Sequence, residues 1–229
     1  MSDPRAVRAM FARIARRYDF LNRLLSVGID RRWRAALVQH LGDLQGRTML
    51  DSCCGTGDLA FALERGGARV LGVDFTPEML GRARAKGAGF RARFVAGDAL
   101  RLPLRSGAVD GAAIAFGIRN VAERRSGLAE LRRVVRPGGV VVILEFSLPS
   151  GRILGWLYRQ YFTRVLPRLG GWISGDPAAY RYLPDTVLAW PSPSELQSEM
   201  QALGLADCGF RRLSGGIACL SYGRVPGAT

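Results

Sequence analysis

The segment LDSCCGTGDLA, residues 50–60, holds the residue types best suited to ligand chemistry. Gly55 and Gly57 permit a tight turn in which backbone atoms come close to a bound ligand. The spacing Gly55-x-Gly57-x-x-Ala60 also fits the glycine fingerprint of dinucleotide-binding loops. The loop therefore predicts a site for a nucleotide-like cofactor, with a nicotinamide dinucleotide as one candidate.

Charge distinguishes the candidate cofactors. Asp51 and Asp58 flank the glycines, and their carboxylates would repel the pyrophosphate of a dinucleotide. S-adenosylmethionine instead carries an ammonium and a sulfonium group, which carboxylates attract. The loop thus favours S-adenosylmethionine as the bound cofactor.

Two further acidic residues follow expected strands. Asp74 ends the run VLGVD, where a carboxylate could accept hydrogen bonds from both ribose hydroxyls, as it also does in enzymes that bind NAD. Asp98, in GDA, could accept from an adenine amino group. Taken singly, Asp51 could cap a helix, Asp74 could begin a turn and Asp98 could simply end a strand. Acids after three successive strands around a glycine loop favour the methyl donor.

The elements that would position these residues alternate between strand-like and helix-like patterns from Thr48 onward. The strand-like runs are TMLDSC, ARVLGVD, RARFVAGD, VDGAAIAF and GGVVVILEF, with two more near 206–213 and 217–224. Helix-like runs include LAFALER, PEMLGRARAK, LAELRRVV and residues 194–203. This alternation predicts an α/β fold with a doubly wound, mostly parallel, seven-stranded, Rossmann-like sheet. Such sheets bind ligands beyond the carboxyl ends of their strands.

Residues 1–45 and 150–190 fall outside this alternation. The first segment reads as helices around a break at Ser26-Val27-Gly28, and the second contains the aromatic, arginine-rich run ILGWLYRQYFTRVLPRLGGWI. We expect a single domain over residues 1–229. Its parts would be an N-terminal helical lid (1–45), a donor-binding core (46–149), a helical insertion on the substrate side before the last two strands (150–190), and a C-terminal helix and strand pair (191–229).

The composition bounds partners and location. A net charge of +14 points to a nucleic acid or an anionic membrane, although Lys86 is the only lysine and the codon bias of a GC-rich genome would also produce an arginine excess. The most apolar run, Gly139–Phe146, is too short to cross a bilayer, so we expect a cytoplasmic protein. Four cysteines without a CxxC pair, with a single histidine, predict reduced thiols and no metal site.

Separated segments of the chain resemble the menaquinone and ubiquinone biosynthesis C-methyltransferase family, a part of the class I methyltransferases. The likeness lies in VRAMFARIARRYDFLNRLLSVGIDRRWR, LDSCCGTGD, FGIRNV, and LEFSLP with the following YFTRVLPRLGGWISGDPAAYRYLPDTV. The glycine loop is common to the superfamily, whereas FGIRNV and YRYLP are more specific. The resemblance implies methyl transfer from S-adenosylmethionine to a ring carbon of a polyprenylated quinol, either demethylmenaquinol or the equivalent ubiquinone precursor. The compact length favours the menaquinone branch.

The resemblance also assigns the donor contacts. They fall on Thr56, Asp74, Asp98, Ala99 and Ala115. Ala115 departs from the family pattern because many relatives have serine there, which leaves only backbone or packing contacts at this position. With the loop and the residue after Asp74, the expected donor site comprises Asp51, Gly55, Thr56, Gly57, Asp74, Phe75, Asp98, Ala99 and Ala115.

Methylation of a ring carbon needs an electron-rich ring, which a hydroquinone provides once a hydroxyl loses its proton. A phenol pKa of about 10 makes this loss unfavourable at neutral pH, so the phenolate must be stabilised or a base supplied. The resemblance gives this role to Arg119 and Asn120 of FGIRNV, with Tyr18 folding over from the N-terminal helices. Because arginine stays protonated, Arg119 would act electrostatically. His40 lies among leucines, and we interpret it as structural.

The insertion suggests where the acceptor and the membrane would bind. Its helix carries arginines from Arg152 to Arg168 beside an apolar stripe, which is typical either of core packing or of prenyl-tail binding with peripheral contact to the anionic inner face of the cell membrane.

The alternative of a nucleic-acid methyltransferase is disfavoured, because FGIRN lacks the Asn/Asp-Pro-Pro-aromatic sequence of amino-methylating enzymes. A methyl-transfer assay would exclude a module that binds the donor without turnover. Homo-oligomer formation stays open.

Overall fold

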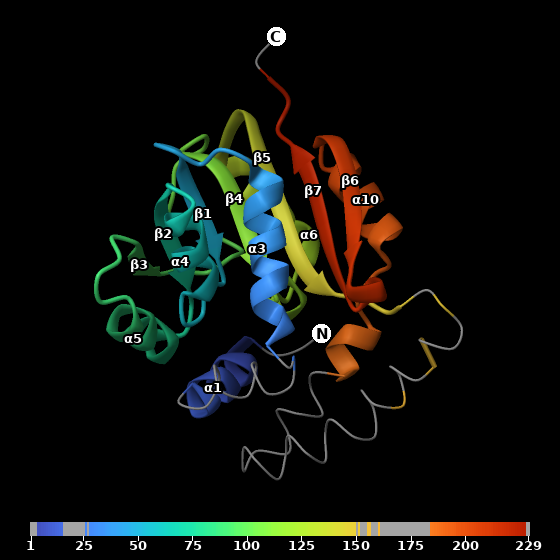
Figure 1. Cartoon of the computed structure of the whole chain (residues 1–229), viewed down its shortest axis with the longest axis horizontal. Coiled ribbons are helices and arrows are strands. Elements are labelled where there is room, and N and C mark those ends of the chain that lie inside the picture. The colour runs from blue at the N-terminus through green and yellow to red at the C-terminus, as the bar shows by residue number, and fades with distance from the viewer. Residues whose placement is uncertain are drawn as a thin grey trace.

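The computed structural model describes residues 4–15, 26, 28–149, 151, 155–156, 160 and 184–227. A seven-stranded sheet forms its centre, in the order β3-β2-β1-β4-β5-β7-β6 (Figure 1). The strands are β1 (Thr48–Ser52), β2 (Arg69–Asp74), β3 (Arg93–Ala96), β4 (Val109–Ala115), β5 (Val135–Phe146), β6 (Ala206–Leu213) and β7 (Ala218–Arg224). The first five run parallel, and β7 is antiparallel to both of its neighbours. The expected mostly parallel, seven-stranded sheet is confirmed.

Helices cover both faces of this sheet. They are α1 (Pro4–Ile14), α3 (Ile29–Leu41), α4 (Asp58–Arg65), α5 (Pro77–Lys86), α6 (Arg124–Val134) and α10 (Pro193–Ala202), with short 3-10 turns η1 (Ile118–Asn120) and η3 (Ser214–Gly216). Side chains of α3, α4 and α5 form one apolar cluster with the sheet, and those of α6 and α10 form another on the opposite face. Figure 1 shows α3 in front of the sheet and α6 behind it. The fold is therefore doubly wound, as expected.

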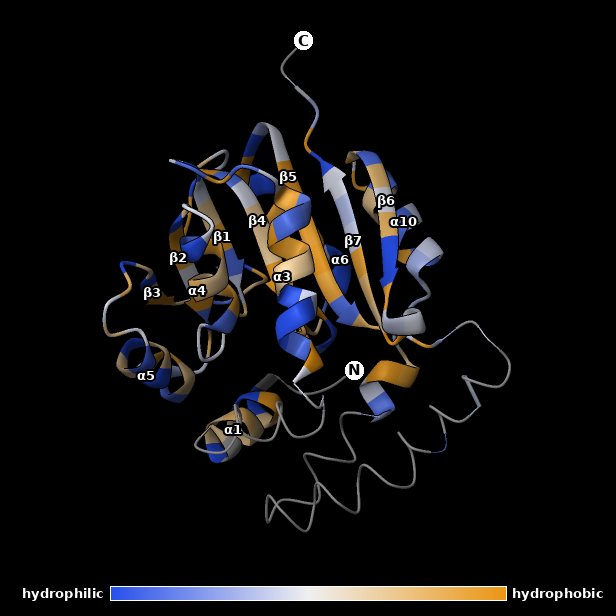
Figure 2. Ribbon diagram, in the orientation of Figure 1, coloured by the Kyte–Doolittle hydropathy of each residue, from blue (hydrophilic) through white to orange (hydrophobic). Residues whose placement is uncertain are grey.

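The apolar run in β5 shows why a continuous hydrophobic sequence becomes a central strand. Val142 and Leu144 pack into the cluster with α3 and α4, while Val141 and Ile143 pack into the cluster with α6 and α10. All four side chains have no exposed surface. Because successive side chains of a strand point to opposite faces, a strand covered on both sides must be apolar at every position. Figure 2 shows the resulting hydrophobic band along β5.

Element boundaries differ from the sequence expectation at two places. The strand expected from Gly138 begins at Val135, directly after α6, and its register with β4 shifts between Val109 and Gly111 to accommodate the RPGG turn. Helix α6 begins at Arg124, before the expected LAELRRVV run. Gly28, the last residue of the expected N-terminal break, has a φ of 73° just before α3. Within the described ranges, no helix is long and apolar enough to cross a membrane.

Candidate active site

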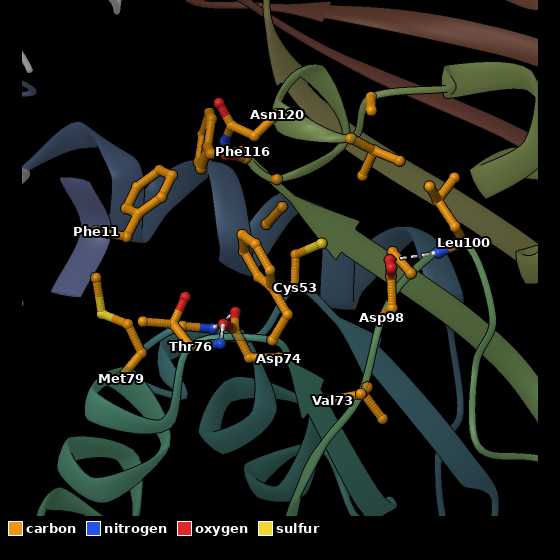
Figure 3. A pocket seen from close by; sticks show the side chains of 18 residues that line it. Phe11, Cys53, Val73, Asp74, Thr76, Met79, Asp98, Leu100, Phe116 and Asn120 are labelled. Atoms are coloured by element: carbon orange, nitrogen blue, oxygen red, sulfur yellow. Dashed lines mark hydrogen bonds between the residues drawn. The ribbon is translucent and has the colours of Figure 1, made fainter. Parts of the chain in front are cut away.

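A pocket opens at the carboxyl ends of the parallel strands, where the alternating pattern predicted it (Figure 3). The residues that line it follow β1, β2, β3 and β4, and α1 closes one side. They are Phe11, Cys53, Gly55, Val73, Asp74, Phe75, Thr76, Met79, Gly97, Asp98, Ala99, Leu100, Ala115, Phe116, Gly117, Asn120, Val121 and Ala122. The structure thus brings together Gly55, Asp74, Phe75, Asp98, Ala99, Ala115 and Asn120 of the residues expected at the site.

Asp74 joins the end of β2 to the glycine loop. Its Oδ2 accepts a hydrogen bond from the backbone N–H of Gly55 at 2.9 Å, and its Oδ1 accepts one from Thr76 at 2.8 Å. Burial raises the pKa of Asp74, and these backbone hydrogen bonds oppose the rise. Each carboxylate oxygen has a second lone pair. Asp74 can therefore hold the loop in place and still accept hydrogen bonds from a ligand's hydroxyl groups.

Asp98 stands in a turn on another side of the pocket (Figure 3). Its Oδ1 accepts a hydrogen bond from the backbone N–H of Leu100 at 2.9 Å, and its backbone oxygen accepts one from Arg101 at 3.0 Å. The carboxylate is exposed, whereas the neighbouring Ala99 is buried and lines the pocket. This turn presents an acceptor and an apolar surface together, an arrangement suited to the edge of a nucleobase.

Three residues of the expected donor set lie behind the loop rather than in the pocket wall. Asp51 is 1% exposed, and its Oδ2 has no hydrogen-bond partner in the part of the chain that the structure describes. Thr56 is buried and lies 3.4 Å from the Lys86 ammonium. Gly57 precedes α4 with a φ of 84°, and a Cβ there would lie 3.0 Å from the Phe61 ring. These residues support the loop from its inner side.

The acidic residues that flank the glycines lie near protein cations and are absent from the described pocket lining, whereas the sequence analysis expects them to face a cationic ligand. Burial raises the pKa of Asp51 to about 8, and the positive charge of Arg34 opposes this rise. Asp58 forms a short ion pair with Lys86 and lies 3.7 Å from Arg34. Arg34, on α3, also pairs with Asp30. At neutral pH the Asp51 carboxyl is therefore largely protonated and Asp58 is paired with Lys86, while Asp74 and Asp98 are the acidic residues that line the pocket.

Two strained residues shape the wall beyond β1 and β4. Cys53 has a φ of 53° and Phe116 a φ of 57°, in the left-handed region that non-glycine residues rarely adopt. Both line the pocket. A Cβ on the adjacent Gly117 would lie 2.5 Å from the Cβ of Cys53, so only glycine lets the two loops approach this closely. Strain of this kind clusters at functional sites, where the surrounding structure enforces it.

The FGIRNV segment places its two polar residues differently. Asn120 is half-buried and lines the pocket. Arg119 is absent from the described lining residues, because its guanidinium turns behind the wall and donates to the carbonyl of Phe116 at 2.8 Å and to Glu145 at 2.5 Å. The structure therefore brings Asn120 to the pocket and leaves Arg119 behind it. Tyr18, the third residue expected to act in catalysis, lies outside the described residues.

Several lining residues were missed from the sequence. In Figure 3, Phe11 is drawn next to Phe116, whereas Met79 is drawn next to Thr76 and Asp74. Phe11 belongs to the apolar spacing of the N-terminal helix, and Met79 to that of α5, which packs against α1. Helical spacing identifies an apolar face without telling whether it meets the core or a ligand. Only the tertiary structure shows that Phe11 and Met79 line the pocket.

Metal-ligating side chains do not cluster in the described ranges. No group of three or more histidine, cysteine, aspartate or glutamate residues there could hold a metal ion. The four cysteines are free thiols.

Comparison with known sequences gives one consistent result. A model of the ubiE/COQ5 methyltransferase family matches residues 1–224. The demethylmenaquinone methyltransferase of Thermus thermophilus is 48% identical over 95% of this chain and 100% of its own length. The protein of the same name in Deinococcus radiodurans is 46% identical over 95% of this chain and 92% of its own. The ubiquinone/menaquinone biosynthesis C-methyltransferase UbiE of a Geobacter species (strain M21) is 44% identical over 95% of each chain.

Solved structures match the fold at low sequence identity. An S-adenosylmethionine-dependent methyltransferase of Thermotoga maritima has a TM-score of 0.69 and 19% identity, over 95% of this chain and 99% of that one. Another from Aquifex aeolicus has a TM-score of 0.61 and 20% identity, over 84% and 89%. At these identities the matches show the fold, and the expected Rossmann-like methyltransferase sheet is confirmed.

Proposed function

Because the chain belongs to the ubiE/COQ5 methyltransferase family, we propose that it methylates a ring carbon of demethylmenaquinol to give menaquinol. Family membership makes it an S-adenosylmethionine-dependent C-methyltransferase of quinone biosynthesis. The naphthoquinol is favoured over the benzoquinol of ubiquinone biosynthesis because relatives that match at 48% and 46% identity are named demethylmenaquinone methyltransferases. The observation that carries the reaction is a single pocket with carboxylates at one end and Asn120 with an aromatic wall at the other.

The carboxylate end of the pocket fits an adenosyl group. Asp74 has acceptor capacity beside the backbone of Gly55, as the ribose hydroxyls require. Asp98 and Ala99 offer an acceptor and an apolar contact for the adenine ring. Phe75 and Ala115 complete the wall by packing, and Asp51, Thr56 and Gly57 hold the loop from behind. When bound, S-adenosylmethionine supplies an electrophilic methyl group on a sulfonium ion.

The other end of the pocket suits an aromatic acceptor. Phe11 and Phe116 provide apolar surface, and Asn120 provides an amide that can bind a quinol oxygen. The ring carbon becomes nucleophilic when a hydroxyl of the quinol ionises. It would take the methyl group as the S–CH3 bond of the donor breaks and S-adenosylhomocysteine leaves, and the methylated carbon would then release its proton to water to restore the aromatic ring. Arg119 does not line the pocket and its charge is paired with Glu145, so it would act on the acceptor through the Phe116 carbonyl that its guanidinium holds. Tyr18 remains an expected contributor from the N-terminal segment.

A methyl-transfer assay with reduced acceptors tests this function. Donor carrying a labelled methyl group is mixed with demethylmenaquinone that has been reduced to its quinol, and the labelled lipid is identified by chromatography. We expect label in menaquinone, and much less with the equivalent benzoquinol or with the unreduced quinone, whose ring carbon is electron-poor. Equal or faster transfer to the benzoquinol would contradict the proposed acceptor, and transfer to neither would contradict the function.

We also propose peripheral contact with anionic membranes, where a prenylated quinol resides. The net charge of +14 supports it, as does Trp156, which is 61% exposed in the described part of the insertion. Most of the arginine-rich run from Arg152 to Arg168 lies outside the described residues. Co-sedimentation with anionic vesicles should be strong at low salt and fade at high salt. Equal binding to neutral vesicles would contradict this contact. We propose no nucleic acid partner.

A further inference from the structure

The wall between the pocket and Arg119 contains a buried ion pair. Nη1 of Arg119 donates to Oε1 of Glu145 at 2.5 Å, and the two side chains are 8% and 2% exposed. The guanidinium also lies over the Phe146 ring, 5.4 Å from its centroid. The remaining atoms of the pair are poorly satisfied, since neither Nε of Arg119 nor Oε2 of Glu145 has a hydrogen-bond partner among the described residues.

Such a pair is weak as a source of stability. Removing two charges from water is unfavourable, and apolar residues of similar volume often stabilise a protein as well or better. The two polar atoms without hydrogen-bond partners add to the free-energy cost of burying the pair. Stability therefore does not explain this ion pair well. Its contacts with the pocket wall indicate another role.

The pair is attached to the strained residue of the pocket wall. The carbonyl of Phe116 accepts a hydrogen bond from Nη1 of Arg119, the same atom that meets Glu145, and it lies 3.5 Å from Nδ2 of Asn120. On the other side, the backbone N–H of Phe116 donates to Leu144 at 2.8 Å, one residue before Glu145. Phe116 is thus held at both of its backbone polar groups while its φ is 57°.

We infer that Glu145 is a positioning residue of the reaction: it holds Arg119 against the carbonyl of Phe116 and so fixes the acceptor end of the pocket. Arg119 alone has a flexible side chain with several rotatable bonds. Glu145 is itself fixed, because its Oε1 also accepts from the backbone N–H of Phe146 at 2.9 Å within the central strand β5. The rigid strand thereby determines where Phe116, Gly117 and Asn120 lie.

This inference rests on the proposed function, and two substitutions at Glu145 test it. Glu145→Gln keeps an oxygen that accepts from Arg119, so kcat should stay within about threefold of the wild type. Glu145→Leu removes every acceptor, and kcat should fall by about a hundredfold, the loss expected when reacting groups are displaced by about 1 Å. The Kd for S-adenosylmethionine should change by less than about threefold in both variants, because Asp74 and Asp98 are untouched.

A matched control and a double variant separate positioning from general destabilisation. Glu199→Gln removes the charge of another close ion pair, with Arg124 at 2.5 Å, which lies outside the pocket wall, and kcat should stay unchanged. Where Glu145→Leu does not fold, Arg119→Met combined with Glu145→Leu removes both buried polar groups together. That double variant should fold and match the kcat of Arg119→Met alone, since Glu145 acts through Arg119.

Hydrogen exchange of residues 116–121 gives a readout that does not depend on turnover. Exchange of these amides should be about tenfold faster in Glu145→Leu or in the double variant than in the wild type, with Glu145→Gln close to the wild type. Unchanged exchange, or a Glu145→Leu variant that turns over within about threefold of the wild type, would overturn the positioning role. A wild type that methylates no quinol would overturn the proposed function instead, and the exchange experiment would still decide the role of Glu145.

Discussion

The two ends of the pocket are built by different means. At the donor end, Asp74 and Asp98 accept backbone hydrogen bonds from Thr76 and Leu100, each two residues on, and Asp74 also accepts one from Gly55, which is 19 residues away. At the acceptor end, Phe116 is held by Arg119, whose partner Glu145 is 26 residues away. The donor end is thus fixed mainly by local turns, and the acceptor end by contacts between distant segments. A site can therefore have one half that short motifs predict and another half that only the folded chain reveals.

The largest effect is expected from removing the cation at the acceptor end. Arg119→Ala leaves Glu145 buried without a countercharge, so the free energy of unfolding at neutral pH should fall by about 3–5 kcal/mol. Turnover of the folded fraction should fall by about a hundredfold or more, while donor affinity should change little. Urea unfolding and calorimetry measure the two quantities separately. If the variant loses donor affinity to the same extent as turnover, the two ends are not independent.

The corresponding change at the donor end is Asp74→Asn. It replaces a carboxylate that binds two backbone N–H groups, so donor affinity should weaken by about 1–3 kcal/mol, while kcat at saturating donor should stay within about threefold. Asp43→Asn is the matched control, because Asp43 makes the same type of hydrogen bond to a residue two positions on, Gln45, at 2.9 Å. Its donor affinity should equal that of the wild type. Unchanged affinity in Asp74→Asn would remove this residue from the donor site.

Asp51, beside the donor loop, should make the stability of the folded protein depend on pH. Its pKa is raised from 3.8 to about 8 by burial, so the folded protein holds a proton that the unfolded chain releases between these values. Stability should therefore decrease as the pH rises through this range, by about 1 kcal/mol per unit. Asp51→Asn cannot lose a proton and should show a smaller decrease between pH 6 and about 8. Parallel pH dependences in urea unfolding would show that Asp51 ionises normally.

The smallest effect is expected at Ala115, where β4 ends between the two halves of the pocket. Ala115→Ser adds the hydroxyl that the family resemblance leads us to expect at this position. Because the residue is half-buried and lines the pocket, donor affinity should change by about 0.5 kcal/mol, a factor of two to three. A tenfold gain in calorimetry would mean that this chain lacks a donor contact that its relatives use.

The sequence predicted those features that depend on local periodicity and turn chemistry. The seven strands followed from alternating patterns, and the positions of Gly55, Asp74 and Asp98 followed from the ends of those strands. The direction of individual side chains was harder to predict. Asp51 is expected at the ligand because it stands beside the glycines, whereas in the structure it is buried near Arg34 of α3 and is absent from the described pocket lining. Sequence adjacency to a loop does not determine which face of the sheet a strand residue occupies.

At the acceptor end, sequence patterns identified the residues but not their contacts. FGIRNV indicated Arg119 and Asn120 as a unit, but a 3-10 turn separates their directions, and only Asn120 lines the pocket. The pairing of Arg119 with Glu145 depends on β4 and β5 being neighbours in the sheet, a relation that no local pattern contains. Phe11 carried the ordinary signal of an apolar helix face, so nothing in its spacing distinguished a ligand contact from core packing.

The pairing of Lys86 with Asp58 has a practical consequence for protein chemistry. Since Lys86 is the only lysine, an amine-acylating reagent has this side chain and the amino terminus as its primary-amine targets. The side chain is 27% exposed, so slow acylation is expected, and it would neutralise the cation that faces Asp58 and lies near Thr56 beneath the glycine loop. The rate of that acylation, followed by mass spectrometry with and without S-adenosylmethionine, would report whether donor binding changes the exposure of Lys86 in the unmutated enzyme.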